Sequence, residues 1–394
     1  MNSLKRSLQE VAVRNVTALV RRYVDDGRFP GTVTVVAHRD EVVLFDMYGR
    51  RDVERDRPMT ADTIFRIYSM TKPIVSLGLM QLYEEGRFQL DDPVVKYLPE
   101  LGRPKVYTDG SVRESIRDMT VRDLLMHTSG LAASNGSHPV SLLYQDAGLT
   151  RTSDLTLAEL PALLAELPLR ADPGTRWIYG ISTDLVGRLC EVLGGVPLDE
   201  YLKTRIFDPL GMTDTGFSVP EASLSRFAAA YGYDDGGFTL LDDPLTSAYT
   251  QQRTYLSGVA GLVSTAGDYL RFTRMLAGGG SLDGTRIIGS RTLRFMTMNH
   301  LPGGQDLAAF ADFGGETKRA GQGFGLGFGV LLDPTVAQTI GTPGEFFWGG
   351  KASTAFFVSP ADELVVVFLT QLRPSASYPI RRELRAAIYA SLDD

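Results

Sequence analysis

The segment Ser69-Met70-Thr71-Lys72 places a hydroxyl and an amine three residues apart in the chain. It follows the mostly apolar residues 64–68 and opens a stretch with apolar positions at helical spacing, which should end near Gly86. Residues i and i+3 lie on one face of a helix, so the Lys72 amine can reach the Ser69 hydroxyl. The helix N-terminus favours a developing oxyanion and disfavours a protonated amine. The pattern therefore predicts a serine nucleophile with a base beside it.

A Ser-x-x-Lys pattern alone is weak evidence, because about one is expected by chance in a chain of this length. Residues 173–180 supply a second motif, a turn followed by Trp177 and Tyr179. A tyrosine at the end of such a loop can present its phenol to a cleft. Trp177 is a candidate for substrate binding and equally for packing in the core.

A third motif, residues 347–351, carries Trp348, Gly349, Gly350 and Lys351 ahead of a predicted strand. Two glycines let a substrate lie against the backbone as an added strand would. Trp348 is open to the same two interpretations as Trp177, and these are the only two tryptophans in the chain.

The elements that must position these motifs come from both ends of the chain. Apolar residues at helical spacing predict terminal helices over residues 4–26 and 380–392. Two hairpins are predicted from β-rich runs, at 32–38 with 41–48 and at 352–358 with 363–369. A lone hairpin is marginally stable, so we predict one antiparallel sheet built from both ends and covered by both terminal helices.

The middle of the chain is richer in helical patterns. Helices are predicted over residues 121–127, 157–166, 183–193, 198–206 and 266–276, and long loops at 131–152, 213–257 and 299–322. We predict two domains with the Ser69 helix at their junction, where clefts usually form. One is a discontinuous α/β domain of residues 1–100 and 290–394, and the other is a mainly helical domain of residues 101–289 that carries the loops of the substrate cleft.

The composition excludes several classes of protein. The 394 residues are 43% apolar and 22% charged, with a net charge of −7, which is typical of a globular chain and unfavourable for binding nucleic acid. One cysteine, Cys190, and four scattered histidines predict no disulfide, no metal and no cofactor. The N-terminus has no signal-peptide pattern and no apolar span of 18 residues occurs, so we predict a cytoplasmic protein without a membrane partner.

Ser69-Met70-Thr71-Lys72, Tyr179 and Trp348-Gly349-Gly350, in this order, resemble the serine β-lactamase and penicillin-binding-protein superfamily. The chain is most similar to the family VIII carboxylesterases, which resemble class C β-lactamases. Further stretches that resemble family landmarks lie at residues 90–93, 124–131, 207–212 and 261–265. The resemblance covers nearly the whole chain. It implies an α+β fold of the β-lactamase/transpeptidase type, with a central antiparallel sheet, flanking N- and C-terminal helices and a mostly helical domain.

The resemblance also implies roles for the motif residues. Ser69 would be the nucleophile that accepts the acyl group, and Lys72 with Tyr179 would remove its proton. Either partner could be the base, because burial disfavours a charged amine and a nearby cation favours a phenolate. The backbone N–H groups of Ser69 and Lys351 would form the oxyanion hole.

Departures from the lactamase pattern bear on the substrate. Class C enzymes carry Tyr-x-Asn where this chain has Tyr179-Gly180-Ile181, and Lys-Thr-Gly where it has Trp348-Gly349-Gly350. Both losses favour a neutral ester, although a weakened lactamase would show the same changes. Lys351 lies one position too far along the strand to replace the missing lysine. Tyr68 and Trp177, with residues 348–350, are the predicted substrate-binding residues.

The histidines do not support an ordinary esterase. No Gly-x-Ser-x-Gly pentapeptide occurs, and the last histidine is His300. His127 is interpreted as a structural residue, and Cys190 as a buried small hydrophobe.

The sequence therefore predicts a cofactor-free serine hydrolase that acts on small, short-chain carboxylic esters as a monomer or small homo-oligomer. The alternatives are a β-lactamase or D,D-peptidase, an acyltransferase that uses the same three residues, and a non-catalytic penicillin-recognising domain, which is the least favoured.

Overall fold

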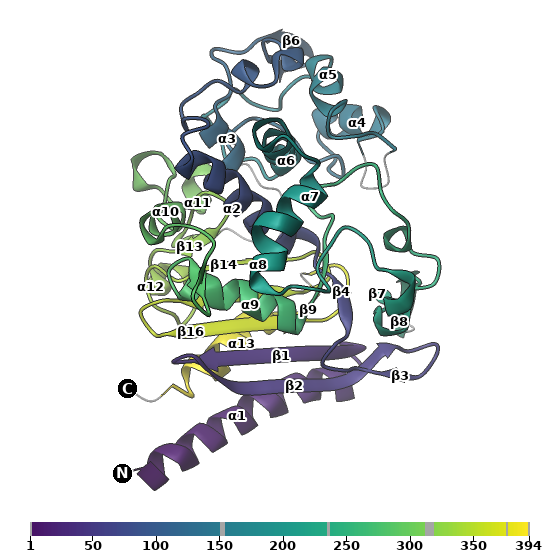
Figure 1. Cartoon of the computed structure of the whole chain (residues 1–394), viewed down its shortest axis with the longest axis vertical. Coiled ribbons are helices and arrows are strands. Elements are labelled where there is room, and N and C mark those ends of the chain that lie inside the picture. The colour runs from purple at the N-terminus through teal and green to yellow at the C-terminus, as the bar shows by residue number, and fades with distance from the viewer. Residues whose placement is uncertain (1, 150–153, 235–236, 312–318, 376, 393–394) are drawn as a thin grey trace.

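A computed structural model describes residues 2–149, 154–234, 237–311, 319–375 and 377–392 (Figure 1). In Figure 1 an antiparallel sheet crosses the lower half of the molecule, with helix α1 (Asn2–Asp25) below it and most of the other helices above it. Strands from the two ends of the chain lie side by side in this sheet, purple beside yellow.

The described residues form one sheet of eight strands. Its strand order is β12 (Gln322–Phe324), β13 (Gly329–Leu331), β14 (Phe346–Gly349), β15 (Ala355–Ser359), β16 (Leu364–Leu369), β1 (Gly31–His38), β2 (Glu41–Asp52) and β3 (Arg57–Pro58). The two ends of the chain meet where β1 pairs with β16, with Val33 opposite Leu369. The predicted sheet built from both ends of the chain is confirmed.

Both faces of the central strands are covered, which explains their continuous apolar sequence. On one face, α1 and α13 (Ile380–Tyr389) pack through Val20 and Leu384 against Val36 and Phe368. On the other face, Val33 and the neighbouring inward residues pack against the core beneath α9 (Ala266–Ala277) and α2 (Thr71–Glu84). Alternate residues of one strand thus fill two cores. The predicted terminal helices are confirmed as the cover of the sheet.

Helix α2 lies in the interior and carries the Ser-x-x-Lys segment at its start. Its residues from Thr71 to Leu82 are all buried, and it packs against α6 (Ser182–Gly194). Cys190 of α6 is buried against the Val75 carbonyl, as predicted. A short 3-10 turn, Tyr68–Met70, precedes α2. Ser69 therefore lies in this turn, two residues before the start of the helix that it was predicted to open.

The remaining elements form the helical part of the molecule and its small hairpins. The helices are α3 (Val121–Leu125), α4 (Pro139–Asp146), α5 (Leu160–Ala165), α7 (Leu198–Leu202), α8 (Asp208–Leu210), α10 (Ser290–Met296), α11 (Leu307–Phe310) and α12 (Pro334–Ala337). The paired strands are β4 (Ile64–Arg66) with β9 (Val263–Thr265), β5 (Lys105–Thr108) with β6 (Ser111–Glu114), β7 (Ala230–Asp234) with β8 (Gly237–Asp242), and β10 (Ser281–Leu282) with β11 (Thr285–Arg286).

The three predicted loops are more ordered than expected. The loop at 131–152 contains α4, the loop at 213–257 contains the β7–β8 hairpin, and the loop at 299–322 contains α11. Residues 150–153, 235–236 and 312–318 of these predictions lie outside the described residues. These elements are short and lack the long periodic pattern by which a helix or strand is found in a sequence.

The predicted division into two domains stays a prediction. Helix α9, which the boundary at residue 289 assigns to the helical domain, packs against β15 and β16 of the sheet. In the described part of the chain, no helix is long and apolar enough to cross a membrane.

Candidate active site

The turn that carries Ser69 is held from several sides. The Ile67 N–H donates to Leu262 O at 3.2 Å, and the Tyr269 hydroxyl donates to Met70 O at 3.0 Å. Tyr68 has a positive φ of 45°, which is uncommon for a residue with a side chain and typical of constrained functional turns. Tyr68 and Met70 are fully buried, whereas Ser69 between them is partly exposed. The turn therefore offers its serine to the exterior.

Lys72 is buried one helical turn beyond Ser69. Its Nζ lies 3.3 Å from Ser69 Oγ and 3.1 Å from Val259 O. The same Nζ lies 4.4 Å from the centroid of the Tyr179 ring. The structure thus brings together the three residues that were predicted to carry the chemistry.

Tyr179 follows a short extended segment. The Ile178 N–H donates to His127 O at 2.8 Å, and the Trp348 indole N–H donates to Tyr179 Oη at 3.2 Å. Burial by itself raises the pKa of the Tyr179 phenol. The positive charge of Lys72 and hydrogen bonds from Lys72, Ser69 and Trp348 outweigh burial, so the pKa of Tyr179 is lowered below its ordinary value.

Aromatic rings pack around Tyr179. Trp177 stacks on Tyr179 with ring centroids 5.6 Å apart, and the His127 ring lies 5.0 Å from the same tyrosine. Trp348 lies 5.5 Å from it, and Phe324 contacts both tryptophans. The stacked rings leave Tyr179 few alternative rotamers. Trp177 is only 2% exposed, so most of its surface serves this packing.

His127 packs within this aromatic group. Burial, followed by the nearby charge of Lys72, holds the pKa of its imidazole well below the ordinary range. Its backbone adopts a positive φ of 58° just after α3. These features agree with the structural role that the sequence predicted for His127.

The end of β14 approaches the serine turn closely. A Cβ on Gly350 would lie 2.6 Å from Ile67 O, two residues before Ser69. Only glycine lets the strand come this near. Lys351 follows as an exposed residue in the turn that leads to β15. The structure therefore brings the predicted oxyanion-hole segment beside the serine turn.

One edge of this site carries a cation that sequence reasoning missed. The Arg319 guanidinium lies 5.0 Å from the centroid of the Trp348 ring, in the range of a cation–π contact. Trp348 itself is 6% exposed. Trp348, whose presence in place of a lysine was predicted to favour a neutral ester, is therefore bordered by a positive charge.

Sequence reasoning also missed a buried acid, Asp184, in the first turn of α6. Its carboxylate accepts hydrogen bonds from Tyr255 Oη at 2.8 Å, Ser257 Oγ at 2.9 Å and the Val259 N–H at 3.0 Å. Burial raises the pKa of Asp184, while these donors and the charge of Lys72 oppose that rise. Because Val259 O accepts from Lys72, Asp184 fixes the segment that holds the amine. An acid in the first turn of a largely apolar helical stretch was the available signal.

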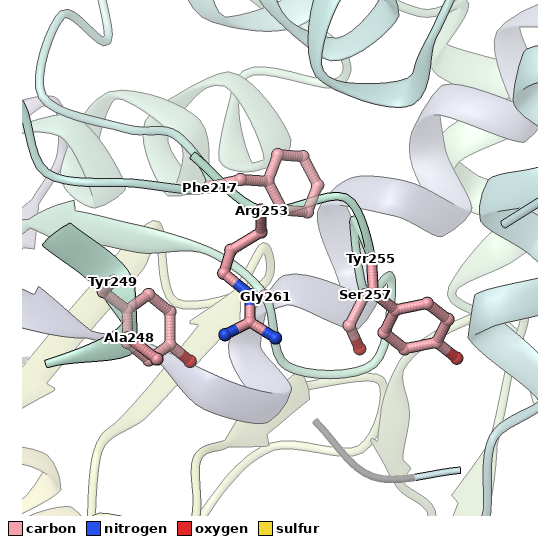
Figure 2. A pocket seen from close by; sticks show the side chains of 7 residues that line it. All are labelled: Phe217, Ala248, Tyr249, Arg253, Tyr255, Ser257 and Gly261. Carbon is pink, nitrogen blue, oxygen red and sulfur yellow. The ribbon is translucent and has the colours of Figure 1, made fainter. Parts of the chain in front are cut away.

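A small cavity lies on this segment (Figure 2). Phe217, Tyr249, Arg253, Tyr255, Ser257 and Gly261 line it, together with Ala248. In Figure 2 Arg253 extends toward Gly261, with Tyr249 on one side and Ser257 and Tyr255 on the other. Its volume of about 20 Å³ suits a water molecule and is too small for an acyl group.

No group of His, Cys, Asp and Glu within the described ranges could hold a metal ion. The chemistry available from the described side chains is that of a serine nucleophile, an amine and a phenol.

Comparison with known proteins places this chain in a family. The profile of the β-lactamase family matches residues 16–390. Esterase EstB from Burkholderia gladioli is 34% identical over 385 residues, which cover 92% of this chain and 91% of the esterase. The structure of EstCE1, a hydrolase with promiscuous acyltransferase activity, matches with a TM-score of 0.81 at 27% identity, covering 97% of this chain and 99% of EstCE1. Simvastatin synthase from Aspergillus terreus matches with a TM-score of 0.78 at 25% identity, covering 98% of this chain and 97% of the synthase.

Proposed function

The chain belongs to the β-lactamase family as an esterase-like serine hydrolase, and we propose that it cleaves short-chain carboxylic esters through an acyl-enzyme on Ser69. One observation carries this proposal. Lys72 Nζ lies within 3.3 Å of Ser69 Oγ and beside Tyr179, whose phenol has a lowered pKa. A hydroxyl next to a group that can accept its proton is the arrangement that nucleophilic catalysis requires.

In this mechanism Tyr179 is the base and Lys72 stabilises its phenolate. Ser69 Oγ bonds to the ester carbonyl carbon while its proton passes to Tyr179. The bond to the alkoxy oxygen then breaks, and that oxygen takes the proton and leaves as an alcohol. Water attacks the acyl-enzyme in the same way and gives its proton to Tyr179. The proton returns to Ser69 Oγ as the carboxylic acid is released.

The oxyanion of each tetrahedral intermediate needs hydrogen-bond donors. We assign this role to the backbone N–H groups of Ser69 and Lys351. The close approach of Gly350 to Ile67 supports the assignment, because it brings the two chain segments together. Preorganised donors of this kind contribute about 10²- to 10³-fold each to kcat.

The substrate class follows from Trp348, which stands where the lactam-binding lysine of the family would be. An indole offers no charge to a substrate carboxylate, so the desolvation of that carboxylate is poorly compensated. Arg319 borders the same ring, and anionic esters therefore belong in the test beside neutral ones.

The proposal is tested by comparing p-nitrophenyl esters from acetate to decanoate with 4-nitrophenyl hydrogen succinate, nitrocefin and a D-Ala-D-Ala peptide. We expect the highest kcat/KM between acetate and hexanoate, a fall with longer chains, and little turnover of nitrocefin. A kcat/KM for nitrocefin above that for p-nitrophenyl butyrate would favour the β-lactamase alternative. Preference for the succinate over the butyrate would show that Arg319, and not Trp348, dominates this edge.

Acyl transfer is the second candidate, because two similar structures are described as an acyltransferase-competent hydrolase and a synthase. The same acyl-enzyme would then pass its acyl group to an alcohol instead of water. The fraction of new ester formed from p-nitrophenyl butyrate in the presence of a small alcohol measures this partition. Ester yield above that expected from the alcohol-to-water ratio would favour the transferase.

A further inference from the structure

The two glycines after Trp348 both lie against Thr354, but their other neighbours differ. A Cβ on Gly349 would lie 2.7 Å from the Arg381 guanidinium carbon, whereas a Cβ on Gly350 would lie 2.6 Å from Ile67 O. Successive residues of a strand point to opposite faces of the sheet. The end of β14 is therefore enclosed between Arg381 of α13 on one face and the serine turn on the other.

Arg381 forms two hydrogen bonds with backbone carbonyls at this point. Its Nη2 donates to Gly350 O at 2.9 Å and to Thr354 O at 2.8 Å. The Gly350 N–H also donates to Thr354 O, at 2.9 Å, and closes the turn between β14 and β15. A planar guanidinium is suited to holding two carbonyl oxygens at once.

Gly350 O belongs to the peptide unit whose N–H is that of Lys351. This peptide is trans, since the cis bond of the described chain is Arg373–Pro374. The C=O and N–H of a trans peptide point in opposite directions. With its C=O directed to Arg381, the unit directs its N–H away from α13 and toward the face where Gly350 meets Ile67.

We propose that Arg381 is a positioning residue that sets the orientation of the Lys351 N–H in the oxyanion hole. This inference rests on the proposed function of Ser69 and Lys351. Arg381 does not touch the substrate; it acts through the Gly350–Lys351 peptide. A cation on the C=O also polarises the peptide and strengthens the N–H as a donor. Because arginine stays charged throughout the working pH range, the effect does not depend on pH.

Arg381 could instead only anchor α13 to the sheet. The two roles differ in what they do to the reaction. Loss of an anchor lowers the stability and the activity toward all esters alike. If the Lys351 N–H loses its orientation, kcat falls for esters whose tetrahedral intermediate carries a negative oxygen. It falls less for substrates whose intermediate accepts weaker hydrogen bonds from the oxyanion hole.

The test replaces Arg381 by Met, which keeps the length of the side chain and removes its donors, and by Lys. Arg382→Met is the matched control, because Arg382 is the next residue of α13 and also donates to a backbone carbonyl, that of Gln338, away from the site. Each variant is assayed with p-nitrophenyl butyrate and with the corresponding thionoester, whose sulfur is a poor hydrogen-bond acceptor.

For Arg381→Met we expect kcat on the oxoester to fall about 10- to 100-fold, less than the ~10²- to 10³-fold loss for deleting an oxyanion donor. KM should change little, and the thionoester rate should fall less, so the preference for the oxoester shrinks. Arg382→Met should match the wild type in this preference. Arg381→Lys should show a smaller shift in the same direction, and this variant decides the question if Arg381→Met does not fold.

Equal losses on both esters, or an unchanged kcat in a folded variant, would overturn the role of Arg381. Failure of the proposed function looks different. If Ser69→Ala hydrolyses the oxoester as fast as the wild type, then the reaction does not use this site and the fault lies with the function, not with Arg381.

Discussion

Lys72 and the Gly350–Lys351 peptide are held in place in opposite ways. At Lys72 the backbone holds a side chain, because Val259 O accepts a hydrogen bond from the amine at 3.1 Å. The Val259 N–H in turn donates to the Asp184 carboxylate. At Gly350 a side chain holds the backbone, because Arg381 donates to Gly350 O at 2.9 Å. In the first case a flexible, titratable amine is ordered. In the second case a rigid peptide unit, which does not titrate, is ordered.

The difference predicts how each half responds to change. The half with Lys72 and Tyr179 depends on charge, so pH and the removal of a nearby donor should alter it. The half with Gly350 and Lys351 depends on backbone geometry, so pH should leave it unchanged and only displacement of the peptide should harm it. Ser69 belongs to both halves, as nucleophile and as N–H donor.

Ser69→Ala should have the largest effect, because it removes the oxygen that bonds to the acyl group and leaves the reaction without a nucleophile. We expect loss of ester turnover to the background rate with an unchanged fold, since the hydroxyl has no packing role. A fluorophosphonate should label the wild type at Ser69, with mass spectrometry of the labelled peptide as the measurement. Equal labelling of the Ala variant would contradict the assignment.

Lys72→Ala and Tyr179→Phe should each lower kcat by at least about 10²-fold, the lower range for losing a positioned acid or base. The double variant should lose far less than the product of the two, because the residues act as one unit. Steady-state kinetics of the four proteins measure this coupling. Full additivity would mean that the two residues do not share a proton path.

The sequence predicted the parts of this site that depend on local spacing. Ser69 and Lys72 are one helical turn apart, and the runs that became β1 and β16 are apolar enough to be recognised. Asp184 and Arg381 could not be found in this way, because their partners lie far along the chain: Val259 is 75 residues from Asp184, and Gly350 is 31 residues from Arg381. The short strands β12 and β13 escaped for another reason, since a Gly-rich three-residue strand shows no alternation.

Asp184→Asn tests the chain of contacts behind Lys72. An amide has one acceptor oxygen instead of two, so at least one of the three donors loses its partner, at about 1–3 kcal/mol of unfolding free energy. We expect kcat to fall about 10-fold as Val259 O moves from Lys72, the small end of such positioning effects. Asp199→Asn in the first turn of α7 is the control, because Asp199 is partly exposed and accepts only from the neighbouring Glu200 N–H, and its change should stay within about 0.5 kcal/mol. Denaturant unfolding and kcat are measured on both, and a destabilised Asp184→Asn with full kcat would separate Asp184 from the chemistry.

Trp348→Phe removes one hydrogen bond to Tyr179 and keeps an aromatic ring. The indole N–H favours the phenolate, so its loss should raise the pKa of Tyr179. The rise of kcat/KM with pH should then shift to higher pH, and activity at neutral pH should fall by a few fold. A pH profile from 5 to 10 is the measurement. A lower rate with the same midpoint would show that Trp348 acts only by packing.

His127 should matter least to the chemistry, because it packs behind Tyr179 and carries no proton to the substrate. His127→Phe keeps an aromatic ring in contact with Trp177 and Tyr179 and should change kcat by less than about threefold, against ~10²-fold for a true base.

The main effect of His127→Phe should be on how the free energy of unfolding depends on pH. The pKa of His127 is lower in the folded chain than in the unfolded chain. Below about pH 6.5 the unfolded chain therefore binds a proton at His127 that the folded chain does not bind. The wild type should therefore lose up to about 1.4 kcal/mol of unfolding free energy per pH unit below that point through this group. His127→Phe cannot titrate and should lose less between pH 7.5 and 5.5, which denaturant unfolding at the two pH values measures. A folded His127→Phe protein without activity would restore histidine to the mechanism, and an unchanged pH dependence of stability would mean that His127 is protonated in the folded chain.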